Sequence, residues 1–203
     1  GPSLRALVVD ASAIADLDYS AARSLRDLIN EERGLSLTHI VNLMNQICGA
    51  VHAAHLNGVL LRGLKPENIF IEKARDGSDQ VKVGGYGLAK ISEGAQGAGL
   101  TGPLGIFGAP EYTSPEQWLN RPLDACSDVY ALGAILFELL TGAPPFTAET
   151  PREFADQHIN SPVPDLMEFV RGDLNEGVAD VVNRALAKEP EQRQASALQL
   201  ATE

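Results

Sequence analysis

The ten-residue stretch LRGLKPENIF, Leu61 to Phe70, brings together side chains that could take part in chemistry. Lys65 offers a positive charge and Asn68 an amide three residues later, a combination that could bind a phosphate group. The same two residues can equally be scaffold, because an asparagine side chain commonly bonds to the backbone of its own loop. Taken alone, the pair favours the scaffold interpretation.

The histidines and cysteines predict neither a metal site nor a disulfide. Four histidines are spread along the chain: His39, His52, His55 and His158. None has a neighbouring cysteine or acidic cluster at the spacing of metal ligands, and His52 and His55 are expected to lie solvated on a helix. Cys48 and Cys126 lie in apolar helical patterns far apart in sequence, so we expect buried free thiols, as in a reducing cytoplasm. No cofactor is predicted.

Length, composition and charge bound the class of protein. The 203 residues are 44% hydrophobic, which predicts one compact domain over residues 1–203. The formal net charge of −11 works against binding to nucleic acid or to an anionic membrane. The longest apolar run, ALGAILFELL, is too short to cross a bilayer and carries Glu138, so no membrane insertion is expected. Gly1-Pro2 resembles the remnant of a cleaved tag, so this cytoplasmic domain could belong to a larger, membrane-tethered protein.

The first half of the chain predicts a short strand, two helices and a hairpin. Residues 3–19 have the pattern of a strand, LRALVVD, followed by an Ala-rich connection. SLRDLINEERG is expected to form a helix closed by Gly34. A long amphipathic helix follows from the cap Ser36 to the stop at Asn57-Gly58. NIFIEK and QVKVGG flank the turn signal Asp76-Gly77, which predicts a small hairpin.

The second half predicts a long loop and four helices. Residues 85–116 are expected to form that loop, because glycine is frequent in most of this segment and has no regular spacing. The segment from Ser127 to Leu140 is apolar on nearly every side, so it should be a buried central helix. Further helices are expected to begin near Thr150-Pro151, Asn175 and Gln194.

Five sequence blocks, in order, carry a family resemblance that covers nearly the whole chain: VLLRGLKPENIFI, VKVGGYGLAK, GAPEYTSPEQW, SDVYALGAILFELLTGAPPF and VVNRALAKEPEQR. Their order and spacing resemble the C-terminal lobe of a bacterial-type Ser/Thr protein kinase. The resemblance implies a mainly α, protein-kinase-like C-terminal lobe with one or two small β-hairpins. It also implies that the N-terminal lobe is absent, because no Gly-rich phosphate loop, strand lysine or partner glutamate precedes these blocks.

The resemblance breaks at the positions that do chemistry in such kinases. The loop that usually reads His-Arg-Asp is Leu61, Arg62 and Gly63, so the aspartate that accepts the substrate proton is missing. The metal-binding asparagine survives as Asn68, while the second metal ligand, an aspartate, is replaced by Gly85. The threonine whose hydroxyl meets the loop aspartate and lysine is replaced by Ala109. A general base typically contributes about 10²- to 10⁴-fold to a rate, and one neutral asparagine is a poor magnesium site.

Other positions keep the residues that hold such a lobe together. The resemblance implies a buried ion pair between Glu116 and Arg193, and it makes Asp128 the acid that caps the catalytic loop from the central helix. Arg62 could grip a phosphorylated activation loop, with the phosphate on Thr101 or Ser92. We disfavour that role, because no aspartate remains in the loop for the grip to position.

These observations predict a catalytically inactive pseudokinase lobe, not an enzyme, that binds neither ATP nor magnesium and acts as a protein-interaction or scaffold module. Its partner would be another protein or a second copy of the chain, bound on the face that an N-terminal lobe normally covers. The candidates for that face are Leu60, Ile69 and Tyr86. Two alternatives stay open: a nucleotide-binding switch, and an atypical kinase completed by a separate N-terminal lobe.

Overall fold

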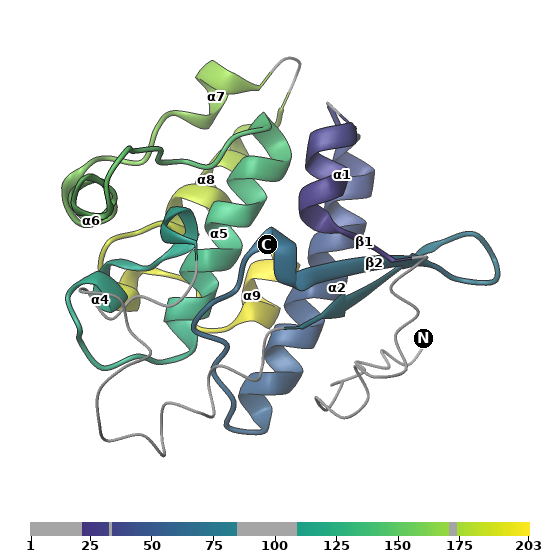
Figure 1. Ribbon diagram of the computed structural model, residues 1–203, viewed down its shortest axis with the longest axis horizontal. Helices are drawn as coiled ribbons and strands as arrows, with labels where there is room; N and C mark the ends of the chain where they lie inside the picture. The colour runs from purple at the N-terminus through teal and green to yellow at the C-terminus, as the bar shows by residue number, and fades with distance from the viewer. Residues whose placement is uncertain (1–21, 33, 85–108, 171–173) are drawn as a thin grey trace.

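The structure, a computed structural model, describes residues 22–32, 34–84, 109–170 and 174–203. Two long helices organise the chain, and the shorter helices pack around them (Figure 1). The α-helices are α1 (Leu25–Glu31), α2 (Leu37–Leu56), α4 (Pro115–Trp118), α5 (Ala125–Thr141), α6 (Pro151–Asn160), α7 (Leu166–Phe169), α8 (Glu176–Ala185) and α9 (Ala197–Thr202). Three 3₁₀ turns join them: η2 (Pro66–Asn68), η3 (Pro110–Tyr112) and η4 (Pro190–Gln192).

The helix α2 begins and ends where the sequence predicts. The Ser36 side chain accepts a hydrogen bond from the backbone N–H of His39, which satisfies one of the free donors of the first turn. The apolar residues at helical spacing, among them Leu43, Ile47 and Val51, are fully buried. The helix therefore contributes one continuous apolar face to the core.

The helix α5 is the buried centre of the molecule, as its apolar sequence predicts. Gly142 ends it in the left-handed conformation with φ of 84°, which favours glycine. A Cβ at Gly133 would lie 2.7 Å from the Cβ of Ala185, so the two helices α5 and α8 approach each other closely at this point. The central helix also packs against α2, α9 and the turn η3 (Figure 1).

A three-stranded antiparallel sheet lies beside α2, with the order β1 (Arg23–Ser24), β2 (Ile69–Lys73) and β3 (Asp79–Val83). The predicted hairpin is confirmed as β2 and β3, with Ile71 opposite Val81. The strand β1 pairs with β2 through two residues, so the sheet has one strand more than a hairpin. A pairing this short has no alternating pattern in the sequence, which explains why it was not predicted.

The C-terminal helices follow the predicted order with two differences. The third helix begins after the cap Ser196, not near Gln194. The short helix α7, capped by Asp165, was not predicted, because four residues are too few to show a helical period. Residues 3–19 lie outside the described residues, as does the loop over 85–116 except from Ala109 onward. Within the described parts of the chain, no helix combines the length and the apolar character needed to cross a membrane.

Candidate functional site

The loop from Leu61 to Asn68 is anchored by its apolar residues. Leu61 and Leu64 are both buried and belong to the main core cluster. Pro66 starts the 3₁₀ turn η2, where its fixed φ suits the first helical position and its missing N–H is not needed. The polar backbone of the loop is thereby held at the surface of the core.

Asp128 on α5 holds the loop backbone from behind. Its carboxylate is almost fully buried and accepts hydrogen bonds from the N–H groups of Leu61 and Arg62, both at 2.9 Å. His55 on α2 lies on the same carboxylate, with Nε2 2.8 Å from Oδ2. The prediction that His55 is solvated was therefore wrong, since its side chain is only 8% exposed. The sequence showed its place on the helix, but the packing of α2 against α5 decided its partner.

The backbone of Gly63 is held by two hydrogen bonds. The N–H of Gly63 donates to the carbonyl of Leu61 at 2.7 Å, and its carbonyl accepts a hydrogen bond from Nδ2 of Asn68 at 3.3 Å. Asn68 therefore bonds to the loop backbone. Lys65 is half-buried and is the N-cap residue that precedes η2.

The loop does not by itself make a magnesium site. Asn68 is one neutral oxygen ligand, and magnesium needs near-octahedral oxygen coordination, usually including a carboxylate and phosphate groups. The described segments contain no group of three or more histidine, cysteine or acidic side chains that could hold a metal ion. The other position of interest, Gly85, lies outside the described residues.

The segment Ala109–Trp118 lies against the loop. The Nε2 of Gln117 donates to the carbonyl of Arg62 at 2.6 Å, and a small pocket lies between the two segments. Ala109 and Gly63 both line this pocket, together with Asp128. The two small residues therefore face a common space, as the resemblance implies for the larger pair that they replace.

A second polar cluster is centred on Arg26 of α1 and was not predicted from the sequence. The Arg26 guanidinium donates to Glu138 at 2.5 Å, to Glu67 at 2.9 Å and to the hydroxyl of Tyr112. Tyr112 in turn donates to Glu138 at 2.6 Å. Burial alone would lower the pKa of Arg26, but its hydrogen bonds to Glu138 and Glu67 raise that pKa above the ordinary value. Burial and the charge of Glu138 raise the pKa of Tyr112. The sequence shows the charges of Arg26, Glu67 and Glu138, but it does not show that these side chains meet.

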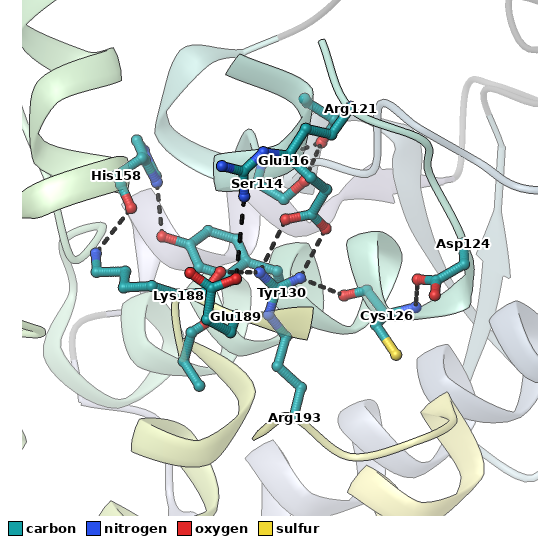
Figure 2. A network of polar contacts seen from close by, with 12 residues as sticks. Ser114, Glu116, Arg121, Asp124, Cys126, Tyr130, His158, Lys188, Glu189 and Arg193 are labelled. Atoms are coloured by element: carbon teal, nitrogen blue, oxygen red, sulfur yellow. Dashed lines mark hydrogen bonds and ion pairs between the residues drawn. The ribbon is translucent and has the colours of Figure 1, made fainter. Parts of the chain in front are cut away.

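The third polar cluster joins α4 to the end of the chain (Figure 2). Arg193 donates two hydrogen bonds to Glu116, from Nη1 to Oε1 at 2.7 Å and from Nη2 to Oε2 at 2.9 Å, and both side chains are buried. Although burial alone would raise the pKa of Glu116, the bonds from Arg193 hold it below the ordinary value. The remaining N–H groups of the guanidinium bind the carbonyls of Cys126, Ala187 and Lys188. The cluster ties segments 77 residues apart in sequence into one unit.

The sequence of this chain matches a known protein family. Residues 8–202 match the family described as "Protein kinase domain". The chain belongs to this protein kinase family. It is 36% identical over 190 residues to "Serine/threonine-protein kinase pkn3" of Myxococcus xanthus, which covers 93% of this chain and 35% of that protein. It is 35% identical over 187 residues to "Serine/threonine-protein kinase PknB" of Mycobacterium tuberculosis, which covers 91% of this chain and 28% of that protein.

Solved structures agree on the fold. The crystal structure of the Mycobacterium tuberculosis PknI kinase domain superposes with a TM-score of 0.65 at 23% identity, covering 90% of this chain and 61% of that one. At this identity the likeness shows the fold alone. The chain thus has a protein-kinase-like fold, and it spans about a third of the length of the curated relatives named above. The predicted absence of an N-terminal lobe stays a prediction, because the family match begins at residue 8 and residues 1–21 lie outside the described residues.

Two predictions are contradicted by these comparisons. The chain was predicted not to be an enzyme, whereas its match to a protein kinase domain and its identity to Ser/Thr kinases point to a kinase. It was also predicted to bind neither ATP nor magnesium, and this conflicts with its similarity to Ser/Thr kinases, a family that binds both. The prediction of a non-enzyme rested on Gly63, Gly85 and Ala109 and on the expected absence of an N-terminal lobe. A lost general base lowers a rate by about 10²- to 10⁴-fold, whereas enzymes accelerate reactions by about 10⁶- to 10¹⁷-fold in total. Gly63 alone therefore does not exclude an enzyme.

The predicted interaction face is contradicted at one residue. Ile69 is fully buried, because the alternation along β2 turns it inward and places Phe70 on the other side. It cannot contact a partner in this fold. Leu60 is half-buried, and Tyr86 lies outside the described residues. Of the two cysteines, Cys48 is buried as predicted, whereas Cys126 is partly exposed.

His158 lies at the centre of an aromatic cluster beside the Arg193 network of the kinase fold (Figure 2). Its Nδ1 lies 2.8 Å from the hydroxyl of Tyr130, and the rings of Phe146 and Phe154 pack around it. The Nζ of Lys188 donates to the His158 carbonyl at 2.9 Å. Burial, together with the charge of Lys188, lowers the pKa of His158 to about 3. This histidine is therefore a neutral core residue.

Proposed function

We propose that this chain is the part of a serine/threonine protein kinase that carries the catalytic loop and binds the polypeptide substrate beside it. The whole protein would transfer phosphate from ATP, with magnesium, to a hydroxyl of another protein. One observation carries the proposal: the loop backbone is held from both sides, at Leu61 and Arg62 by Asp128 and at Arg62 by Gln117. Phosphoryl transfer depends mainly on such positioning, since the protein does little covalent chemistry itself.

The kinase relatives support the same proposal. The proteins pkn3 and PknB are named as serine/threonine kinases, and the regions shared with this chain include the loop and the segment Ala109–Trp118. Because that segment is linked to the loop through Gln117, a polypeptide lying along it would pass close to position 63. Asn68 would hold the loop in this arrangement through its bond to the Gly63 carbonyl.

A second candidate function is binding of a partner protein on the same surface, as a scaffold. The observation that favours it is Gly63, which can neither accept a proton nor orient a substrate hydroxyl. Both candidates require polypeptide binding beside the loop. They differ in whether binding leads to phosphoryl transfer.

The experiment is a phosphoryl-transfer assay on the full-length protein. The protein is incubated with ATP, magnesium and a set of basic test proteins, because its own net charge is −11. Phosphate incorporation is measured by mass spectrometry, and binding by light scattering. Gly63→Asp is compared with the original protein, since the φ of Gly63 is not positive and a side chain fits its backbone. Gly177→Asp is the matched control for the added charge, because Gly177 is exposed and its φ is not positive either.

The expected result is phosphate transfer by the original protein and a gain of about 10²- to 10⁴-fold in Gly63→Asp, with no gain in Gly177→Asp. Polypeptide binding without transfer in either protein would favour the scaffold function. Absence of both transfer and polypeptide binding would refute both candidates.

A further inference from the structure

The residue before the altered catalytic position has an unusual backbone. Arg62 has φ of 59°, in the left-handed region that side chains with a Cβ rarely adopt. Among the described residues other than glycine, only Arg62 and Asn120 have a positive φ. Such a conformation persists only when the surrounding structure holds it in place. In this structure, side chains from other elements hold Arg62 in this conformation.

Both peptide groups of Arg62 are bound by side chains from other elements. Its N–H donates to Asp128 on α5 at 2.9 Å, and its carbonyl accepts from Nε2 of Gln117 on α4 at 2.6 Å. The next carbonyl along, that of Gly63, accepts from Asn68. Three side chains thus hold three successive peptide units, 61–62, 62–63 and 63–64. Gln117 is the one that comes from the Ala109–Trp118 segment.

Gln117 also has a local role at the start of α4. Its Oε1 accepts from the backbone N–H of Ser114 at 3.0 Å and from the Ser114 hydroxyl at 3.1 Å, which completes a capping box. One end of the amide therefore caps the helix, and the other holds the loop. A capping residue needs only the acceptor, so the donor bond to Arg62 is an additional function.

We propose that Gln117 is a positioning residue that sets the backbone conformation of Arg62 and Gly63 and couples the Ala109–Trp118 segment to the catalytic loop. The catalytic consequence rests on the proposed function, because positioning affects phosphoryl transfer only if the chain takes part in it. Without the Gln117 donor, the peptide between residues 62 and 63 loses the bond to its carbonyl, while the bond from the Gly63 N–H to the Leu61 carbonyl stays. The direction in which position 63 faces the pocket would then change.

Gln117→Glu separates the two roles of this side chain. The carboxylate still accepts from Ser114, but it has no N–H to donate to the Arg62 carbonyl. Gln199 provides the matched control: it stands at the same position of α9, and its Oε1 accepts from the backbone N–H of Ala195 at 3.0 Å. Gln199→Glu therefore makes the same substitution away from the loop, and the donor bond that it removes runs to Glu203 at 2.9 Å instead. Gln117→Met also lacks the N–H donor but is neutral. It therefore tests the loss of the donor even if the charge of Gln117→Glu unfolds the domain.

The measurement is the NMR signal of the Arg62–Gly63 peptide. The full-length protein is labelled with carbonyl ¹³C in arginine and ¹⁵N in glycine, so that only Arg-Gly pairs give a cross-peak. In this chain those pairs are Arg33-Gly34, Arg62-Gly63 and Arg171-Gly172. The peak that disappears in Gly63→Ala identifies the peptide of interest, and the other two serve as internal references.

We expect Gln117→Glu and Gln117→Met to shift this carbonyl signal and to speed exchange of the Gly63 amide by about tenfold, as for one lost hydrogen bond. Gln199→Glu should leave both unchanged. An unmoved Arg62–Gly63 peak in a folded Gln117→Glu or Gln117→Met protein would overturn the proposal, and so would shifts spread equally over all three peaks. In an active protein, kcat should fall while the KM for ATP stays constant. A moved peak in a protein that neither binds polypeptide nor transfers phosphate would refute the proposed function and leave the coupling intact.

Discussion

The buried ion pair between Glu116 and Arg193 offers the sharpest test of how this fold is held together. The two side chains are 3% and 0% exposed. All N–H groups of the guanidinium are used, two on the carboxylate and the others on the carbonyls of Cys126, Ala187 and Lys188. The perturbation is to remove each partner alone and then both together.

The structure sets the expected magnitudes. Glu116→Ala leaves a buried guanidinium without its counter-charge, which costs about 3 to 5 kcal/mol of unfolding free energy. Arg193→Ala leaves a buried carboxylate and also three backbone carbonyls without their donor, at about 1 kcal/mol or more for each carbonyl. Arg193→Ala should therefore be the more damaging change. Since a domain is stable by about 5 to 15 kcal/mol in total, that variant should be close to unfolded.

The assay is urea unfolding of the two single variants and the double variant. In the double variant no charge is stranded, so its cost should be far below the sum of the single costs. The pair of Arg121 and Glu189 is the control: its charged atoms are 3.9 Å apart and both side chains are more than half exposed. Glu189→Ala should cost less than about 1 kcal/mol, as exposed pairs do.

The reasoning fails if the buried pair behaves like the exposed one. Single costs below about 1 kcal/mol that simply add in the double variant would mean that burial does not strand a charge here. A double variant as unstable as Arg193→Ala alone would instead assign the cost to the unpaired carbonyls.

Two further predictions concern the core. Because the pKa of His158 is lowered to about 3 in the folded state and is about 6.5 when unfolded, only the unfolded chain takes up this proton between those pH values. Unfolding free energy should fall by about 1.4 kcal/mol per pH unit below pH 6.5; urea titrations should show a shallower slope in His158→Gln, and equal slopes would refute this. Gly133→Ala should destabilise by about 1 to 3 kcal/mol through overpacking, since its Cβ would lie 2.7 Å from that of Ala185. Thermal unfolding should show recovery when Ala185→Gly is added, and no recovery would place the strain elsewhere.

Local features of this protein were determined by its sequence. Ser36 and Asn175 cap their helices as predicted, because a cap depends on a side chain and a backbone N–H two or three residues away. The hairpin of β2 and β3 was likewise predicted from its turn residues and the strand patterns on either side. The family was visible as well, since five motifs keep their order along the chain. The prediction that the chain is not an enzyme was wrong. It relied in part on Gly63 standing where a kinase has an aspartate, and the match to a protein kinase domain contradicts it.

Only the tertiary structure decided which side chains meet around the loop. Gln117 and Arg62 are 55 residues apart, and Arg26 and Glu138 are 112 apart, so no local pattern links either pair. The burial of His55 against Asp128 depends in the same way on how α2 packs against α5. A polar side chain becomes a structural contact only when burial removes water as the competing partner. The sequence therefore determines where helices, turns and caps form, and the packing of those helices determines which polar groups hold the catalytic loop.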